Sequence, residues 1–302
     1  MGPNLGLKTA DPSMKFVMAG MYDFHFEFLK SMVLWFKYYR PDGKVPIDIV
    51  NVHHYSNSLG GQFVAGAVGI SPEADQLVTS MTQFVTQCKT ILPDIPVWIS
   101  EFGYDSSNGS LQKVPSVTGQ TQFLTQANLI LRSILAFTKA KVDKSFIFNI
   151  YDEDVNQNTA STYQSSGLVI QESLGYKPKP GYNFILAFRD LMSNFYYLKD
   201  NSISGTYVYK YTDDSGNYVY ACWSPTSNNS QYTFNLVLEE TNVIAIQYRL
   251  IETQNTFETQ KLQIVSNSVN ITVNESPKFI LVRSQSVLNS LYPNKIKNKK
   301  FF

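Results

Sequence analysis

Cysteine, net charge and long apolar runs are all scarce in this sequence. The 302 residues contain two cysteines and carry a formal net charge of +1. Near-neutral charge argues against a polyanionic partner such as nucleic acid. No run of about 18 apolar residues occurs, which predicts that no segment spans a membrane. Cys88 and Cys222 are interpreted as small buried side chains rather than as a disulfide, and they indicate no cellular compartment.

Signals for secretion, metals and nucleotides are also missing. Residues 1–8 lack the charged and then apolar pattern of a signal peptide, so secretion or export to a periplasm is expected only of a longer parent protein. The three histidines, His25, His53 and His54, do not form a recognised ligand spacing with cysteines or acids. No glycine-rich phosphate loop follows a strand. The sequence therefore predicts neither a metal nor a cofactor.

Apolar β-type runs and helical patterns alternate in the first two thirds of the chain. Strand–helix–strand connections return the chain in the same direction, so the alternation predicts a parallel sheet. About four β-α units end near Lys199, and polar residues at the strand ends are expected on one rim. The predicted strands are 10–21, 47–56, 96–105 and 144–153, and the predicted helices are 24–39, 76–89, 120–139 and 182–195.

The pattern changes near residue 201 to short alternating runs separated by turn residues, which is typical of an antiparallel β-sandwich. We therefore expect a barrel-type α/β domain at 1–199, a β-sandwich domain at 200–285, and a basic flexible tail at 286–302. The predicted sandwich strands are 206–211, 218–223, 232–238, 243–250, 261–265, 269–273 and 278–282.

One strand end has the composition of a catalytic site. The apolar run from Pro96 ends in Glu101 and continues directly into Phe102 and Gly103. Parallel α/β barrels present catalytic groups at the carboxyl ends of their strands. The simpler interpretation is an ordinary buried strand whose last residue is charged.

His53 and Tyr55 alternate along their strand and should therefore point to the same side of it. His54 would then face the helices, unless a bulge at the strand end reverses the assignment. The alternative for this group of side chains is a rim cluster that makes no contact with substrate.

Several of these features together resemble the second half of the barrel in clan A glycoside hydrolases. They are the His53–His54–Tyr55 run, Ser-Glu-Phe-Gly around Glu101, an aromatic on the next strand, and the closing sequences Ser-Gly-Leu at 166–168 and Lys-Pro-Lys-Pro-Gly-Tyr at 177–182. A following β-sandwich is similar to families 39, 30 and 51, and the chain is nearest to family 39 or to an uncharacterised relative of it. The resemblance implies a partial (β/α)8 barrel formed by strands five to eight.

The resemblance also implies a retaining glycosidase in which Glu101 is the nucleophile. The implied substrate is a β-linked or arabino-configured polysaccharide. Tyr151 stands where many of these enzymes carry a tryptophan that stacks on the sugar, and its ring suits the same role. Asn149 and Asp152 are further polar candidates for substrate binding, together with His53, His54 and Tyr55. For Asp152 the alternative is a cap on the loop that follows the strand.

The acid/base carboxylate of these enzymes has no counterpart in the sequence. It normally belongs to an Asn-Glu pair at the end of strand four, and the chain is expected to begin just before strand five. We therefore expect a truncated enzyme whose barrel is closed by the missing amino-terminal half or by a second copy. The alternative is a catalytically inactive carbohydrate-binding protein. Possible substitute acids are interpreted as solvated loop charges: Asp23, Glu73, Asp75, Asp105, Glu153 and Asp154.

Overall fold

A computed structural model describes residues 3–60, 64–153, 160–171, 173 and 175–284. The predicted basic tail at 286–302 therefore lies outside the described residues. The chain divides into two compact units. The first comprises 1–115 and 129–178, and the second comprises 116–128 and 179–302.

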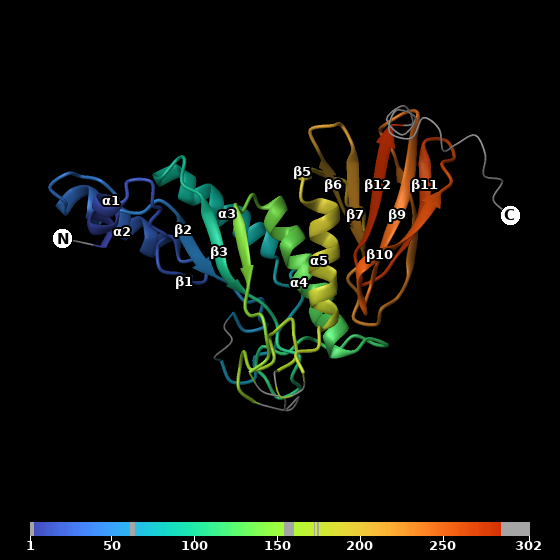
Figure 1. Cartoon of the computed structure of the whole chain (residues 1–302), viewed down its shortest axis with the longest axis horizontal. Coiled ribbons are helices and arrows are strands. Elements are labelled where there is room, and N and C mark those ends of the chain that lie inside the picture. The colour runs from blue at the N-terminus through green and yellow to red at the C-terminus, as the bar shows by residue number, and fades with distance from the viewer. Residues whose placement is uncertain (1–2, 61–63, 154–159, 172, 174, 285–302) are drawn as a thin grey trace. The chain divides into compact units, whose positions relative to one another are not determined.

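The first unit contains a parallel sheet with the strand order β1-β2-β3-β4 (Figure 1). Every pairing in this sheet is parallel, which confirms the partial α/β barrel predicted from the alternating pattern. The strands are β1 (Met21–Tyr22), β2 (Val50–His53), β3 (Val97–Phe102) and β4 (Lys144–Ile147), and the helices are α1 (Pro3–Ala10), α2 (Phe26–Tyr39) and α3 (Leu77–Ile91). The helix α4 (Gln122–Lys139) belongs to this unit from residue 129 onward.

The two central strands of this sheet form its core. Val50 and Val52 of β2 and Val97 and Ile99 of β3 are fully buried, as expected for parallel strands that are covered by helices. Phe102 at the end of β3 meets Phe137 of α4 edge to face, with ring centroids 5.0 Å apart. Packing of this kind fixes the end of β3, from which Glu101 projects.

The second unit contains the helix α5 (Pro180–Met192) and two antiparallel sheets. The larger sheet has the order β10-β9-β12-β7-β6-β5 and the smaller pairs β11 with β8. Buried apolar side chains from both sheets form one core cluster, which is the arrangement of a β-sandwich. The strands are β5 (Tyr196–Asp200), β6 (Tyr207–Thr212), β7 (Tyr218–Trp223), β8 (Tyr232–Val237), β9 (Val243–Ile251), β10 (Gln254–Leu262), β11 (Ser268–Val273) and β12 (Lys278–Ser284).

Three elements differ from the sequence-based expectation. The helix α1 was not predicted, and β5 occupies residues expected near the end of the last β-α unit. The strand expected at 261–265 is only the end of β10, whose earlier residues are mostly polar and exposed. Because most side chains of β10 are exposed, this strand lacks the alternation of apolar residues by which strands are predicted. It is recognised only by its pairing with β9. Within the described part of the chain, no helix is long and apolar enough to cross a membrane.

Candidate functional site

Glu101 lies near the end of β3 with its side chain 31% exposed. The pairing of β2 with β3 is irregular between Val52 and His53, so that His53 lies opposite Glu101. The Tyr55 hydroxyl donates to Glu101 Oε2 at 3.0 Å, and His53 Nδ1 lies 3.4 Å from the same oxygen. The structure therefore brings together one carboxylate, one phenol and one imidazole at the carboxyl end of the parallel sheet.

Tyr55 is held in a group of aromatic rings. Its ring packs on Tyr163 with centroids 5.0 Å apart, and Tyr163 in turn meets Phe148 edge to face at 5.5 Å. Burial, followed by the charge of Glu101, raises the pKa of Tyr55 far above its ordinary value. Tyr55 is therefore a permanent hydrogen-bond donor to Glu101. Tyr163 was missed because a tyrosine in a long polar loop carries no periodic signal of its position.

The His54 side chain is engaged away from Glu101. Its Nδ1 lies 2.9 Å from Asp23 Oδ1 and its Nε2 lies 2.7 Å from Asp75 Oδ2. The Phe24 ring stacks on the imidazole at 4.5 Å. Although burial opposes the charged form, the two carboxylates raise the pKa of His54 to about 9. His54 is thus an imidazolium in the protein interior, and Asp23 and Asp75 are its partners rather than solvated loop charges.

Other acids that were interpreted from the sequence as solvated loop charges also have structural partners. Glu73 accepts hydrogen bonds from the buried guanidinium of Arg132, with Nε at 3.0 Å. Asp105 is fully buried and accepts the backbone N–H of Tyr163 at 2.8 Å. The Glu153 carboxylate accepts from Gln164 at 2.8 Å. Asp154 lies outside the described residues.

The segment after β4 carries the remaining candidates. Tyr151 is 52% exposed, so its ring is available for stacking. Asp152 is fully buried and accepts the Gly167 backbone N–H at 2.9 Å. This contact favours the alternative in which Asp152 caps the loop. The side chain of Asn149 is partly exposed.

Two glycines of the sequence motifs occupy positions that have no room for a side chain. A Cβ at Gly103, directly after the Glu101–Phe102 pair, would lie 2.4 Å from the Phe148 carbonyl oxygen. A Cβ at Gly167, in the Ser-Gly-Leu sequence, would lie 2.2 Å from the carbonyl carbon of Tyr151. Both glycines therefore permit the close approach of neighbouring backbone segments around the candidate site.

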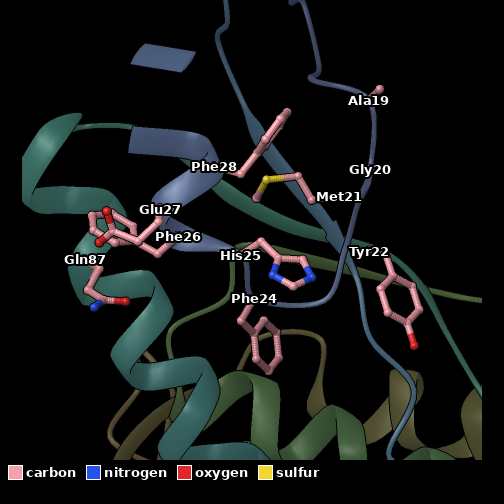
Figure 2. A pocket seen from close by; sticks show the side chains of 10 residues that line it. All are labelled: Ala19, Gly20, Met21, Tyr22, Phe24, His25, Phe26, Glu27, Phe28 and Gln87. Carbon is pink, nitrogen blue, oxygen red and sulfur yellow. The ribbon is translucent and has the colours of Figure 1, made fainter. Parts of the chain in front are cut away.

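Two hollows lie at this end of the first unit. A small one of about 40 Å³ is lined by Tyr22, Asp23, His53, His54, Tyr55, Asn57, Gly60 and Asp75. A larger one of about 800 Å³ lies at β1 and the start of α2, and Figure 2 shows His25, Tyr22 and Phe24 around it. Glu101 does not line the larger hollow. Among the residues with described positions, no group of three or more His, Cys, Asp or Glu could hold a metal ion.

The sequence matches no protein-family model and no curated protein. Solved structures, however, resemble its fold. A family 39 glycoside hydrolase from Bacteroides cellulosilyticus WH2 is similar with a TM-score of 0.56 at 15% identity, over 80% of this chain and 46% of that chain. A family 44 xyloglucanase from Paenibacillus polymyxa is similar with a TM-score of 0.58 at 11% identity, over 93% of this chain and 59% of that chain.

A family 30 endoxylanase from Clostridium papyrosolvens C71 gives a TM-score of 0.55 at 8% identity, over 91% of this chain and 57% of that chain. The fold of this chain resembles part of these glycoside hydrolase structures. The chain spans about half the length of the solved structures it resembles. At these identities the likeness shows the fold, which is a partial barrel followed by a β-sandwich. Because one fold can host many functions, the chemistry of the site depends on its own residues.

Proposed function

We propose that this chain is the nucleophile-bearing part of a retaining glycoside hydrolase. Glu101 attacks the anomeric carbon, and a second carboxylate protonates the leaving oxygen from β-α units outside these residues. A retaining mechanism places the two carboxyl groups about 5 Å apart, which leaves no room for an intervening water. The resulting covalent glycosyl-enzyme is then hydrolysed by water.

The contact between Tyr55 and Glu101 is the observation that supports this proposal most strongly. A hydroxyl at 3.0 Å orients the carboxylate, and His53 on the same oxygen restricts it further. The other carboxylate oxygen, Oε1, is then the candidate for attack on the sugar. Orientation of this kind contributes to catalysis because it removes the freedom that the reacting groups would otherwise lose in the transition state.

Substrate recognition is proposed to come from the polar and aromatic groups beside Glu101. Tyr151 would stack on one face of a sugar ring, and Asn149 and His53 would donate to or accept from its hydroxyls. Asp152 would act indirectly, through the loop that it holds at Gly167. The substrate class is an oligosaccharide or polysaccharide with β-linked or arabino-configured residues.

Labelling of Glu101 tests the proposal without requiring the general acid. A 2-deoxy-2-fluoro glycoside with a dinitrophenolate leaving group needs no protonation to depart, so the nucleophile alone should form a stable adduct. A panel of gluco, xylo and arabino reagents would be applied and the adduct located by peptide mass spectrometry. We expect one sugar on the peptide that contains Glu101, and none in Glu101→Gln.

Glu27→Gln is the matched control, since Glu27 is an exposed carboxylate on α2 that pairs with Lys30 of the same helix. This variant should label as the unmodified chain does. An adduct on a different carboxylate would contradict the role of Glu101.

The second candidate function is carbohydrate binding without hydrolysis. This candidate is favoured because the acids that could have replaced the general acid are engaged in structural contacts. They are Asp23, Glu73, Asp75, Asp105 and Glu153. Saturation-transfer NMR with oligosaccharides would then show binding that weakens in Tyr151→Ala, while no reagent of the panel labels the folded chain.

A further inference from the structure

The His54 side chain is bound on both sides by carboxylates. Nδ1 faces Asp23 at 2.9 Å and Nε2 faces Asp75 at 2.7 Å, while the Ser56 hydroxyl also donates to Asp75 at 2.7 Å. An ionised carboxylate can only accept hydrogen bonds, so both ring nitrogens must carry a proton. The imidazole therefore has a fixed orientation and is positively charged at neutral pH.

These contacts join three separate segments of the first unit. Asp23 follows β1, His54 follows β2, and Asp75 precedes α3. Backbone hydrogen bonds run in parallel with the side-chain contacts: the Asp23 N–H donates to the His53 carbonyl at 2.9 Å, and the His54 N–H donates to the Glu101 carbonyl at 3.0 Å. The residues on either side of His54 are the two that contact the Glu101 carboxylate.

We propose that Asp23, His54 and Asp75 form a positioning cluster that holds His53 and Tyr55 against Glu101. This inference rests on the proposed role of Glu101. The strand β2 ends at His53, so Tyr55 lies beyond the regular ladder and needs another anchor. The cluster supplies it, because a side chain that is bound at both ends cannot rotate and its backbone cannot shift without breaking charged hydrogen bonds.

The charged groups around His54 are consistent with a cation at neutral pH. Asp23 and Asp75 contact His54 directly, and Glu101, His53 and Tyr55 lie on the adjoining strand ends. His25 lies close enough to act electrostatically on Asp23. Glu73, in the same loop as Asp75, is already paired with Arg132. Loss of the His54 charge would leave the Asp23 and Asp75 carboxylates facing each other across a neutral or missing ring. We expect the segments that carry these two carboxylates to move apart.

NMR of the three histidines and of Tyr55 tests this inference on the full chain. We expect both ring nitrogens of His54 to remain protonated at neutral pH. We also expect the 13Cζ resonance of Tyr55, assigned with Tyr55→Phe, to report a hydrogen-bonded phenol at neutral pH and to change as the pH rises through about 9, where His54 loses its proton. In His54→Gln the Tyr55 resonance should already differ at neutral pH, and the change near pH 9 should disappear.

Asp75→Asn provides a second variant that keeps the imidazole and its contact with Asp23. It should lower the titration midpoint of His54 by about one unit and shift Tyr55 in the same direction as His54→Gln. The matched control is Lys30→Gln, which removes a cation of α2 that pairs with Glu27 and should leave the Tyr55 resonance unchanged.

Two results would overturn the inference: an unprotonated His54 ring nitrogen at neutral pH, or a folded His54→Gln or Asp75→Asn protein in which Tyr55 behaves as in the unmodified chain. A loss of thermal stability alone would not support it. Because neither readout uses activity, failure here is distinguishable from failure of Glu101 labelling.

Discussion

At the level of single residues, Tyr55 and His53 both contact the same carboxylate oxygen of Glu101, Oε2, and the other oxygen is Oε1. The Tyr55 hydroxyl is closer to Oε2 than His53 Nδ1 is, at 3.0 Å against 3.4 Å. Burial raises the pKa of Tyr55, so its hydroxyl stays protonated and donates. The distribution of partners over the two oxygens determines which lone pairs are available for attack. It is therefore the property that a mutation at Tyr55 should change first.

We expect Tyr55→Phe to slow fluoro-glycoside labelling of Glu101 by about tenfold, since loss of one hydrogen bond to a charged group is worth about 1.4 kcal/mol or more. The measurement is the rate of adduct formation by mass spectrometry. Tyr38→Phe, which alters an exposed tyrosine of α2, is the control. Equal labelling rates in Tyr55→Phe and the unmodified chain would remove Tyr55 from the site.

Gly20→Ala should displace His53, the second side chain in contact with Glu101. A Cβ at Gly20 would lie 1.9 Å from His53 Nε2, so the imidazole has to move and its contact with Glu101 is expected to be lost. We expect a loss of about 1–3 kcal/mol in the free energy of unfolding and a shifted His53 ring resonance.

Gly6→Ala is the counterpart, because Gly6 lies in α1 and a methyl group there would meet no described atom within 4 Å. This change should be neutral or stabilising by up to about 1 kcal/mol. An unchanged His53 resonance in Gly20→Ala would show that the imidazole does not occupy the described position.

At the level of elements, the His54 cluster predicts a pH dependence of stability. The pKa of His54 is about 9 in the folded chain and about 6.5 when unfolded, so folding favours the protonated form. The stabilisation is fully present below about pH 6.5 and is lost as the pH rises through about 9. It should be on the order of 3 kcal/mol, measured as the difference between unmodified chain and His54→Gln in denaturant unfolding. A difference that is independent of pH over this range would contradict the charged state of His54.

The ion pair between Glu73 and Arg132 connects the loop before α3 with α4. The Arg132 side chain is fully buried and that of Glu73 is 10% exposed. Glu73→Gln should therefore cost about 3–5 kcal/mol in chemical denaturation, because it leaves a buried cation without its counter-charge. The double variant Glu73→Leu/Arg132→Met should recover most of that loss. Asp190→Asn, at an exposed pair with Arg189, should cost less than about 1 kcal/mol.

At the level of the whole molecule, the parallel sheet has β1 and β4 as its edge strands, and α2 exposes large apolar side chains that include Phe28, Trp35 and Tyr38. Exposed apolar patches and unpaired edge strands both favour association. The chain spans 46% and 57% of two solved structures of similar fold, and a closed barrel would cover such surfaces.

We expect the 302-residue chain to self-associate with increasing concentration, and Trp35→Glu/Tyr38→Glu to reduce that association in analytical ultracentrifugation. Val237→Glu, which changes an exposed apolar residue of β8, should leave it unchanged. If the Val237 variant were the one to dissociate the complexes, the contact surface would lie on the second unit.

The sequence alone predicted the β-α units of the first part and the change from parallel to antiparallel architecture, although it missed α1 and β5. Both predictions follow from local periodicity, since β2 and β3 lie in mostly apolar runs with polar ends and α3 and α4 repeat apolar residues at helical spacing. It also predicted Glu101, His53 and Tyr55 as one group, because the strand ends of a parallel sheet lie on one edge. It failed for β10, whose polar residues form a strand only through pairing with β9.

Only the tertiary structure decided which side chains meet. The irregular pairing after Val52 places His53 opposite Glu101, and the alternation within one strand does not specify which residue of the next strand it faces. The partners of His54 come from other segments, Asp23 after β1 and Asp75 before α3, and the ring beside Tyr55 comes from Tyr163 in a distant loop. Such contacts depend on long-range packing, which local periodicity does not encode.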